Sequence, residues 1–271
     1  MKISTVVPTK NSGRTLATCL ESLANQTYGD TETIVVDNQS TDNTVEIAER
    51  LADVVIDQGP ERCAQRNKGA EVATGDIVLF IDSDMVLEPT VLGEIAEVFT
   101  NKPEVGAVTI PERSFGDGYL AECRALEKSL YVGDTDVEAP RAFRIEVFEK
   151  VGGWDETLTA AEDWELSDRT KAHNVVIDRV PSWIWHDEGR ISLRAQFKKK
   201  KYYGRWVAVY FNRKPEARSH VSRPGVFRQR DKLLAHPTKS VGMVVLKSFE
   251  AAGLLAGMRD ARKQGWLDAD K

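Results

Sequence analysis

The first 110 residues alternate between short apolar runs and stretches with helical spacing, and this alternation constrains the fold more than any other feature. The expected strands are Ile3–Pro8, Thr33–Asp37, Val54–Ile56, Asp76–Ile81 and Val105–Thr109, and the expected helices are Leu16–Leu23, Asn43–Leu51, Arg62–Ala73 and Thr90–Phe99. Short strands that are apolar throughout are buried on both faces, which is typical of a parallel sheet covered by helices on both sides. The sequence therefore predicts an α/β fold.

The remaining sequence predicts a different mixture of elements. We expect helices at Leu120–Tyr131, from Arg144 to Lys150, at Glu162–Ala172 and at Ile191–Phe211, short strands at Arg141–Arg144, Val175–Ile177 and Trp183–Trp185, and an irregular stretch from Pro215 to Pro237. The apolar segment Val241–Met258 contains Lys247 and Glu250, so we expect a helix that packs on the core or lies in an interface rather than one that spans a membrane.

Charge is distributed unevenly along the chain. The formal net charge is −5, yet residues 190–232 contain 14 Lys and Arg against two acidic residues. An acidic body with a basic C-terminal segment suggests an anionic partner on that side, although a solvated basic face without a partner fits the same pattern. The three cysteines, Cys19, Cys63 and Cys123, are far apart, which favours a reducing compartment over a disulfide framework or a zinc cluster.

Acidic residues follow two of the expected strands. Asp37 closes the second strand, and Asp82 and Asp84 come directly after the fourth. Carboxyl ends of parallel strands meet at one edge of a sheet, where ligands bind in this fold class. Two carboxylates two residues apart suit a hard cation such as Mg²⁺ or Mn²⁺, which can bridge to a diphosphate. The pattern predicts a metal and diphosphate site, with solvated turn aspartates as the alternative.

The order of several motifs resembles that of family 2 glycosyltransferases, which have the GT-A fold. The segments that carry the resemblance are Val6–Asn11, Ile34–Asp42, Arg62–Ala70, the DxD motif Asp82-Ser83-Asp84, Phe143-Arg144, Gly152–Asp155 and Glu162-Asp163. The match runs over residues 2–190 and is less clear beyond. It implies a Rossmann-like, mostly parallel sheet flanked by helices, with a basic helical C-terminal extension.

The resemblance also implies a nucleotide-sugar site. Residues expected to contact the nucleotide sugar are Pro8, Thr9, Asn11, Asp37, Arg66, Asn67, Asp82 and Ser83. Among them, Asp37 would accept a hydrogen bond from a ring N–H of the base. Asp84 would be the main protein ligand of a Mn²⁺ or Mg²⁺ ion, with Asp82 near the ribose and the metal. His186 is expected to complete the metal site, with a structural role as the alternative.

The same resemblance implies how the sugar is transferred. Asp163 is the expected general base, with Glu162 as an alternative, and a carboxylate that only favours its helix dipole is the plain explanation. One direct displacement would invert the anomeric centre. The acceptor would be a glycan hydroxyl, for which Asp163 takes a proton, or a polyprenyl phosphate, which is already ionised. The basic segment 190–232 is expected to contact a membrane surface peripherally.

These implications define three parts of the chain: residues 1–110 as the nucleotide-sugar-binding half, 111–190 as the acceptor and catalytic half, and 191–271 as the basic extension. We expect a cytoplasmic protein, peripheral at the inner face of the membrane. A sugar nucleotidyltransferase and a non-catalytic nucleotide-sugar-binding protein remain alternatives. Nucleic acid is disfavoured because the body is acidic, and an NAD(P) domain because no GxGxxG follows the first strand.

Overall fold

The computed structural model describes residues 1–135, 137–214 and 229–266, and these form two units. The first unit comprises Met1–Glu112, Glu138–Thr157 and Glu165–Asp187, and the second comprises Arg113–Val137, Leu158–Trp164 and Glu188–Lys271. Both are built from segments that are distant in sequence, so the chain passes between them several times.

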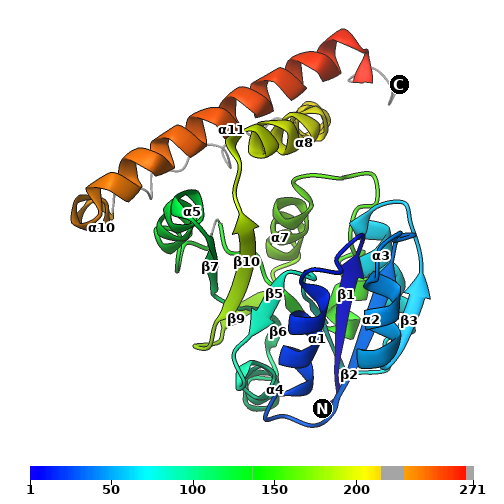
Figure 1. Ribbon diagram of the computed structural model, residues 1–271. Helices are drawn as coiled ribbons and strands as arrows, with labels where there is room; N and C mark the ends of the chain where they lie inside the picture. Colours follow the sequence, from blue (N-terminus) through cyan, green and yellow to red (C-terminus); the bar gives the residue numbers. More distant parts are fainter. Residues whose placement is uncertain (136, 215–228, 267–271) are drawn as a thin grey trace. The chain divides into compact units, whose positions relative to one another are not determined.

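The chain follows the expected alternation of strands and helices (Figure 1). In chain order the elements are β1 (Ile3–Thr9), α1 (Leu16–Ala24), β2 (Thr31–Asp37), α2 (Thr44–Leu51), β3 (Val54–Asp57), α3 (Arg62–Val72), β4 (Ile77–Phe80), β5 (Met85–Leu87), α4 (Val91–Asn101), β6 (Val105–Thr109), β7 (Glu112–Asp117), α5 (Tyr119–Ser129), β8 (Ala142–Arg144), α6 (Ile145–Lys150), α7 (Glu162–Ala172), β9 (Val176–Arg179), β10 (Ile184–Arg190), α8 (Leu193–Arg213), α10 (Arg230–Ala235) and α11 (Pro237–Lys263).

The main sheet has seven strands in the order β3-β2-β1-β4-β8-β6-β9, and a smaller sheet has the order β5-β10-β7. Strand β1 is parallel to both of its neighbours, with Thr9 opposite Asp37 on β2 and Val6 opposite Phe80 on β4. Strand β8 is antiparallel to β4 and to β6, so the sheet is mainly parallel rather than wholly so. The predicted parallel sheet is therefore confirmed, with one inverted strand that the sequence did not reveal.

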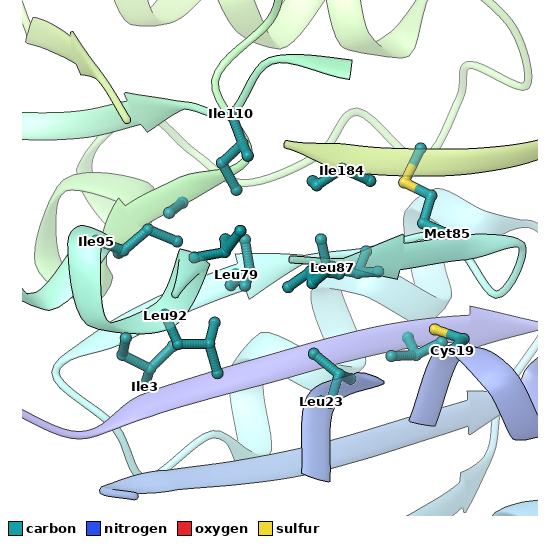
Figure 2. Packing of buried hydrophobic residues seen from close by; sticks show 14 of the residues in the cluster. Ile3, Cys19, Leu23, Leu79, Met85, Leu87, Leu92, Ile95, Ile110 and Ile184 are labelled. Atoms are coloured by element: carbon teal, nitrogen blue, oxygen red, sulfur yellow. The ribbon is translucent and has the colours of Figure 1, made fainter. Parts of the chain in front are cut away.

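Helices cover both faces of the main sheet, as predicted. Successive strand residues point to opposite faces, and Val7 packs with α1, α2 and α4, whereas Val6 packs with α3 and α6. Figure 2 shows the first of these clusters, in which Ile3 of β1, Leu23 of α1 and Leu92 of α4 surround the same apolar space. Burial on both faces explains why the strands are apolar throughout.

The second unit contains two long helices that run side by side, α8 and α11 (Figure 1). Glycines allow their backbones to meet. A Cβ atom added at Gly257 would lie 2.1 Å from the carbonyl oxygen of Lys201, and one added at Gly204 would lie 2.3 Å from that of Leu254. Any larger residue would push the two helices apart, because real Cβ atoms do not approach that closely.

Helix α11 contains the segment Val241–Met258, for which the sequence predicted a helix. Among the described residues it is the one helix whose length and composition would allow it to cross a membrane, with a mean hydropathy of 1.5 over 18 residues. A third of that window is buried within the protein, and core helices of soluble proteins meet the same criterion. The property by itself does not place the helix in a lipid bilayer.

Several predictions of secondary structure were wrong. The short strands β5 and β7 were not expected, and β10 extends five residues beyond the predicted end at Trp185. Helix α10 occupies part of the stretch 215–237 that the sequence predicted to be irregular, while residues 215–228 of that stretch lie outside the described residues. Strand β7 has the sequence Glu-Arg-Ser-Phe-Gly-Asp. Its charged residues and its glycine are uncommon in strands, so the local sequence does not predict one.

Candidate functional site

The order of the strands indicates which edge of the main sheet is suited to bind a ligand. From β1 the chain continues outward to β2 and β3, and it then crosses to β4 on the other side of β1. The direction of the connections therefore reverses between β1 and β4. In open α/β sheets, ligands bind outside the carboxyl ends of the strands at such a reversal. Here those ends carry Thr9 on β1, Asp37 on β2 and Asp82 just after β4.

Asp37 is held rigidly at the end of β2. Its carboxylate accepts hydrogen bonds from the hydroxyls of Thr9 (2.8 Å) and Ser40 (2.6 Å) and from the backbone N–H of Ser40 (2.7 Å). The side chain is only 3% exposed. Because these hydrogen bonds fix the carboxylate in one orientation, Asp37 offers a hydrogen-bond acceptor at a fixed position at this edge of the sheet.

Gln65 also organises this edge, although the sequence did not single it out. Its buried side-chain amide, on α3, donates to the carbonyl oxygens of Thr9 (2.9 Å) and Val36 (2.6 Å), and thereby ties together the ends of β1 and β2. Pro8, which was expected to contact the nucleotide, is buried in β1 opposite Val36. A glutamine on a helix gives no signal of such a role in the sequence.

The loop after β1 connects to both neighbouring loops. Asn11 has a positive φ of 51°, and its side-chain oxygen accepts from the backbone N–H of Thr41 (2.9 Å). The next residue, Ser12, lies with its hydroxyl oxygen 2.8 Å from that of Ser83 in the DxD motif. The loops that follow β1, β2 and β4 are therefore joined by direct hydrogen bonds, as expected for residues that line one site.

Asp82 is paired with one buried cation and lies near a second, partly buried one. Arg66 is 2% exposed and donates to its carboxylate at 2.7 Å, and Arg141 lies 3.8 Å from its other oxygen. Burial alone would raise the pKa of Asp82, but the positive charges of Arg66, Arg141 and Arg62 lower it well below its usual range. The guanidinium of Arg66 also lies over the ring of Trp154, 4.4 Å from its centroid. Asp82 is therefore held as an anion.

Asn67, the neighbour of Arg66, supports the turn that contains Trp154. Its side-chain oxygen accepts from the backbone N–H of Trp154 (2.8 Å), and its amide nitrogen donates to the carbonyl oxygen of the same residue (2.9 Å). Trp154 is buried and packs edge-on against Phe80, which places its ring in the core. These contacts give Asn67 a structural role, and its contact with a nucleotide stays a prediction.

Asp84 and His186 meet, as the expected metal site requires. The His186 Nε2 atom lies 3.2 Å from the Asp84 carboxylate, and its Nδ1 atom lies 3.0 Å from Glu112. Arg141 donates to the other oxygen of Glu112 at 3.1 Å. Burial disfavours the charged imidazole, but the hydrogen bonds to Asp84 and Glu112 outweigh it and raise the pKa of His186 to about 10. Glu112 and Arg141 had not been identified from the sequence.

The donor atoms at this edge fit a hard cation that is shared with a ligand. Among the described residues, no three His, Cys, Asp or Glu side chains are arranged to hold a metal by themselves. Mg²⁺ and related ions bind through one or two protein groups and take further oxygens from phosphates and water. The carboxylate of Asp84, which is 38% exposed, meets that requirement, and His186 would meet it once its Nε2 proton is released, because a metal-binding imidazole must be neutral.

The two candidate catalytic acids begin helix α7. Glu162 and Asp163 belong to the second unit, where Glu162 is buried and Asp163 is half-buried. Their different burial makes Asp163 the more accessible of the two. Further along the helix, Arg169 pairs with Glu165 at 2.5 Å, and Glu165 is buried.

Known proteins resemble this chain in both sequence and fold. The uncharacterized glycosyltransferase YibD of Escherichia coli (strain K12) is 39% identical over 95 residues, which cover 33% of this chain and 28% of that protein. The matched stretches span about a third of the length of the first curated relatives.

Two solved structures have a similar fold. The mannosyltransferase PcManGT from Pyrobaculum calidifontis, in complex with GDP-Man and Mn2+, has a TM-score of 0.60 at 20% identity and covers 99% of this chain and 80% of its own. S. aureus TarS 1-349, in complex with UDP-GlcNAc, has a TM-score of 0.57 at 20% identity and covers 98% and 92%. The expected GT-A-type fold is thereby confirmed.

The sequence itself matches the family model described as Glycosyl transferase family 2 over residues 4–145. That region begins in β1 and ends at the start of α6, so it contains Asp37, Arg66, the DxD motif and Arg141. It covers more than half of the 271 residues, and the chain therefore belongs to glycosyl transferase family 2.

Proposed function

We propose that this glycosyltransferase transfers a sugar from a nucleoside-diphosphate sugar to a glycan or lipid-linked acceptor, that it requires Mn²⁺ or Mg²⁺, and that it inverts the anomeric centre. The observation that carries the proposal is the arrangement at the reversal of the sheet. Asp37 is fixed at the end of β2. Asp84, which follows β4, is paired with His186 on β10. Asp37 is suited to bind a nucleotide base, and the Asp84–His186 pair is suited to bind a diphosphate with its metal.

The nucleotide would lie across the ends of β1 and β2. Asp37 accepts a ring N–H of the base there, because a carboxylate is an acceptor and its position is fixed by Thr9 and Ser40. Uracil and guanine both offer such an N–H. The two solved structures with a similar fold were determined with UDP-GlcNAc and with GDP-Man, so both nucleotides are tested below.

The diphosphate would lie near the DxD motif. Asp84 and His186 would hold the cation, which would supply positive charge to neutralise the negative charge that develops on the departing nucleoside diphosphate. Arg66 and Arg141 keep Asp82 ionised, so that its carboxylate can accept a hydrogen bond from the ribose or contribute to the metal site. The hydrogen bond between Ser12 and Ser83 keeps the loops of β1 and β4 together on either side of this position.

Asp163 would act as the general base toward a hydroxyl acceptor. It takes the proton of the attacking hydroxyl while that oxygen forms a bond to the anomeric carbon and the bond to the diphosphate breaks. Its half-buried position supports this role over that of Glu162, which is buried. A phosphate acceptor is already ionised near neutral pH, and Asp163 would then orient it.

A thermal-shift screen tests the donor and the metal together. The protein is melted with UDP, GDP, dTDP and their sugar conjugates, each with Mn²⁺ and with EDTA. A ligand at about 100 times its Kd adds roughly 2.7 kcal/mol of stability, which raises the Tm visibly. The proposal expects a shift with one nucleotide class that disappears in EDTA and in Asp84→Asn. The matched control Asp57→Asn, at the exposed end of β3, should keep the shift.

Transfer is then measured with the donor so identified. We expect Asp163→Asn to retain the thermal shift and to lose transfer to a hydroxyl acceptor, with Glu46→Gln on the exposed face of α2 as the control. Loss of donor binding in Asp163→Asn would show that the residue is structural. The product with wild-type protein should have the opposite anomeric configuration from the donor, and retention would refute the direct displacement.

A further inference from the structure

Helix α11 exposes an apolar face. Val241, Val244, Val245, Phe249 and Leu255 are all exposed, with Val241 at 65% and Val244 at 59%. Successive members are three, one, four and six residues apart, and at 3.6 residues per turn all five lie on one side of the helix. Exposed alanines at positions 251 and 252 extend the same face. We call these five residues the apolar stripe.

The opposite side of α11 is packed within the second unit, and its composition is unusual for a buried face. The buried residues are Gly242, Met243, Leu246, Glu250, Gly253, Gly257 and Ala261. Four of these seven side chains are a glycine or an acid, whereas several of the largest apolar side chains face outward. A water-exposed helix normally has the reverse arrangement. The face away from the protein is therefore suited to an apolar environment.

The charges of α11 are sorted in the same way. Its two acids are both paired: Glu250 with Arg124 and Lys247, and Asp260 with Lys201 (3.0 Å) and Arg205 (3.3 Å). Positive charges from Arg124, Lys247 and Lys200 outweigh the effect of burial and lower the pKa of Glu250 to about 2. Glu250 therefore stays ionised among these cations.

Exposed basic residues flank the stripe at both ends. Arg259, Arg262 and Lys263 are exposed in the last turns of α11. Arg230 and Lys232 are exposed on α10, which precedes α11, with the exposed acid Asp231 between them. An apolar row with cations at both ends and no exposed acid on its own helix matches the surface of an anionic lipid bilayer, where acyl chains lie beneath phosphates.

We propose that the apolar stripe of α11 lies in the plane of an anionic membrane surface and anchors the protein there as an interfacial helix. The stripe enters the boundary between head groups and acyl chains, while the basic residues at its ends contact lipid phosphates. The apolar stripe lies outside the basic segment 190–232, whereas Arg230 and Lys232 at its N-terminal end belong to that segment.

The structure favours lying on the bilayer over crossing it. Lys247 and Glu250 occupy the middle of α11, and both are engaged in ion pairs with groups of α5 and with each other. The glycines of α11 pack directly on the backbone of α8, so the helix cannot be surrounded by lipid without separating from its partner. One side of α11 therefore stays with the protein, and only the stripe is available to lipid.

Charge also favours lipid over a second copy of this chain. Two copies that met through the apolar stripe would bring the exposed basic ends of α10 and α11 close to each other in either relative orientation. Like charges that face each other across an interface cost several kcal/mol. Anionic lipid removes this repulsion, since each Lys or Arg near such a surface contributes about 1 kcal/mol of binding.

Vesicle co-sedimentation tests the proposal without donor or acceptor, so its result does not depend on sugar transfer. The full chain is mixed with vesicles of phosphatidylcholine, or of phosphatidylcholine with phosphatidylglycerol. We expect binding to the anionic vesicles that weakens with salt, and little binding to the neutral ones. The double variant Val244→Asp/Phe249→Asp should lower the partition coefficient at least tenfold. Arg259→Gln and Arg262→Gln should each lower it about fivefold.

The matched control is Val176→Asp, an exposed valine of β9 in the first unit, which should bind as the wild type does. Circular dichroism melts establish that the variants are folded. Because residues 215–228 of the basic segment are outside the described residues, the informative comparison is between variants confined to α11. Absence of wild-type binding, or undiminished binding of the double variant, would overturn the proposal. So would a lipid-free dimer in sedimentation velocity that Val244→Asp/Phe249→Asp dissociates.

Discussion

The Nε2 atom of His186 lies 3.2 Å from the carboxylate of Asp84, although 102 residues separate them in the sequence. Pairing of β10 with β5 brings them together, because His186 is opposite Met85, the residue after Asp84. The other ring nitrogen contacts Glu112 at 3.0 Å, which fixes the orientation of the imidazole. The imidazole of His186 is therefore held between two carboxylates, one at each ring nitrogen.

We predict that Glu112→Gln weakens the metal site without removing a ligand. Groups that orient a metal-bound histidine typically affect metal affinity by about 10- to 100-fold. The concentration of Mn²⁺ needed for half-maximal activity should rise by that factor, while the KM for donor at saturating Mn²⁺ changes little. Glu46→Gln on α2 is the control. An unchanged Mn²⁺ requirement would mean that His186 does not depend on Glu112.

Asp37→Asn should weaken donor binding while the protein stays folded. An amide oxygen still accepts from Thr9 and Ser40, but the charged acceptor for the base is lost. Hydrogen bonds to charged groups contribute about 1.5–3 kcal/mol, so the Kd of the nucleoside diphosphate should rise roughly 10- to 100-fold. Isothermal titration calorimetry measures this change. Asp57→Asn, the partner of Asp37 in the register with β3, should leave the Kd unaltered.

Arg66→Met should destabilise the first unit. It removes the buried cation that pairs with Asp82 and stacks on Trp154. Breaking a buried ion pair costs about 3–5 kcal/mol, and we expect about 2 kcal/mol here because Asp82 is partly exposed and keeps Arg141 nearby. Urea unfolding measures the loss, with Arg50→Met on the surface of α2 as the control. Arg66→Lys should fall between the two, since lysine cannot stack as a planar group.

The stability of the protein should depend on pH through Glu32. Burial would raise the pKa of its carboxyl group, but hydrogen bonds from Ser4, Thr74 and Lys2 outweigh this effect and lower the pKa from 4.5 to about 2. A pKa depressed in the folded state stabilises the protein above the unfolded value, and this contribution is lost as the pH falls toward the folded value. A shift of this size corresponds to about 3 kcal/mol.

This contribution is measured by comparing wild type with Glu32→Gln in urea unfolding at several pH values. The difference in free energy of unfolding should be constant at neutral pH and should shrink as the pH drops below 4.5, the ordinary pKa of the group. A difference that did not vary between neutral and acid pH would show that Glu32 titrates normally in the folded protein.

The sequence predicted the sheet well where local pattern and tertiary structure agree. Strands β1, β2 and β4 contain apolar runs because helices cover both of their faces, and such runs are visible in the sequence alone. Strand β5 is only three residues long and β7 is polar, and β10 lies between them in the smaller sheet. Pairing with β10 depends on residues 74 or more positions away in the sequence, which no local pattern records.

The candidate site shows the same division. The topology of a parallel sheet was enough to bring Asp37 and Asp82 to one edge, so the sequence predicted their proximity. Gln65 and Glu112 act through contacts with distant strands, and their residue types are common on any protein surface. The roles of Gln65 and Glu112 could therefore not be predicted without knowing which strands lie next to them.

The glycines between α8 and α11 determine which side of α11 looks outward. A backbone contact as close as that of Gly257 with Lys201 is available on one side of the helix alone, so α11 cannot roll about its own axis. The exposure of Val244 and Phe249 therefore depends on glycines on the opposite side of α11, which are not part of the exposed surface. A single methyl group added at Gly253 or Gly257 would collide with the backbone of α8 and displace α11. The direction in which the exposed side chains point would then change, although none of them had been replaced.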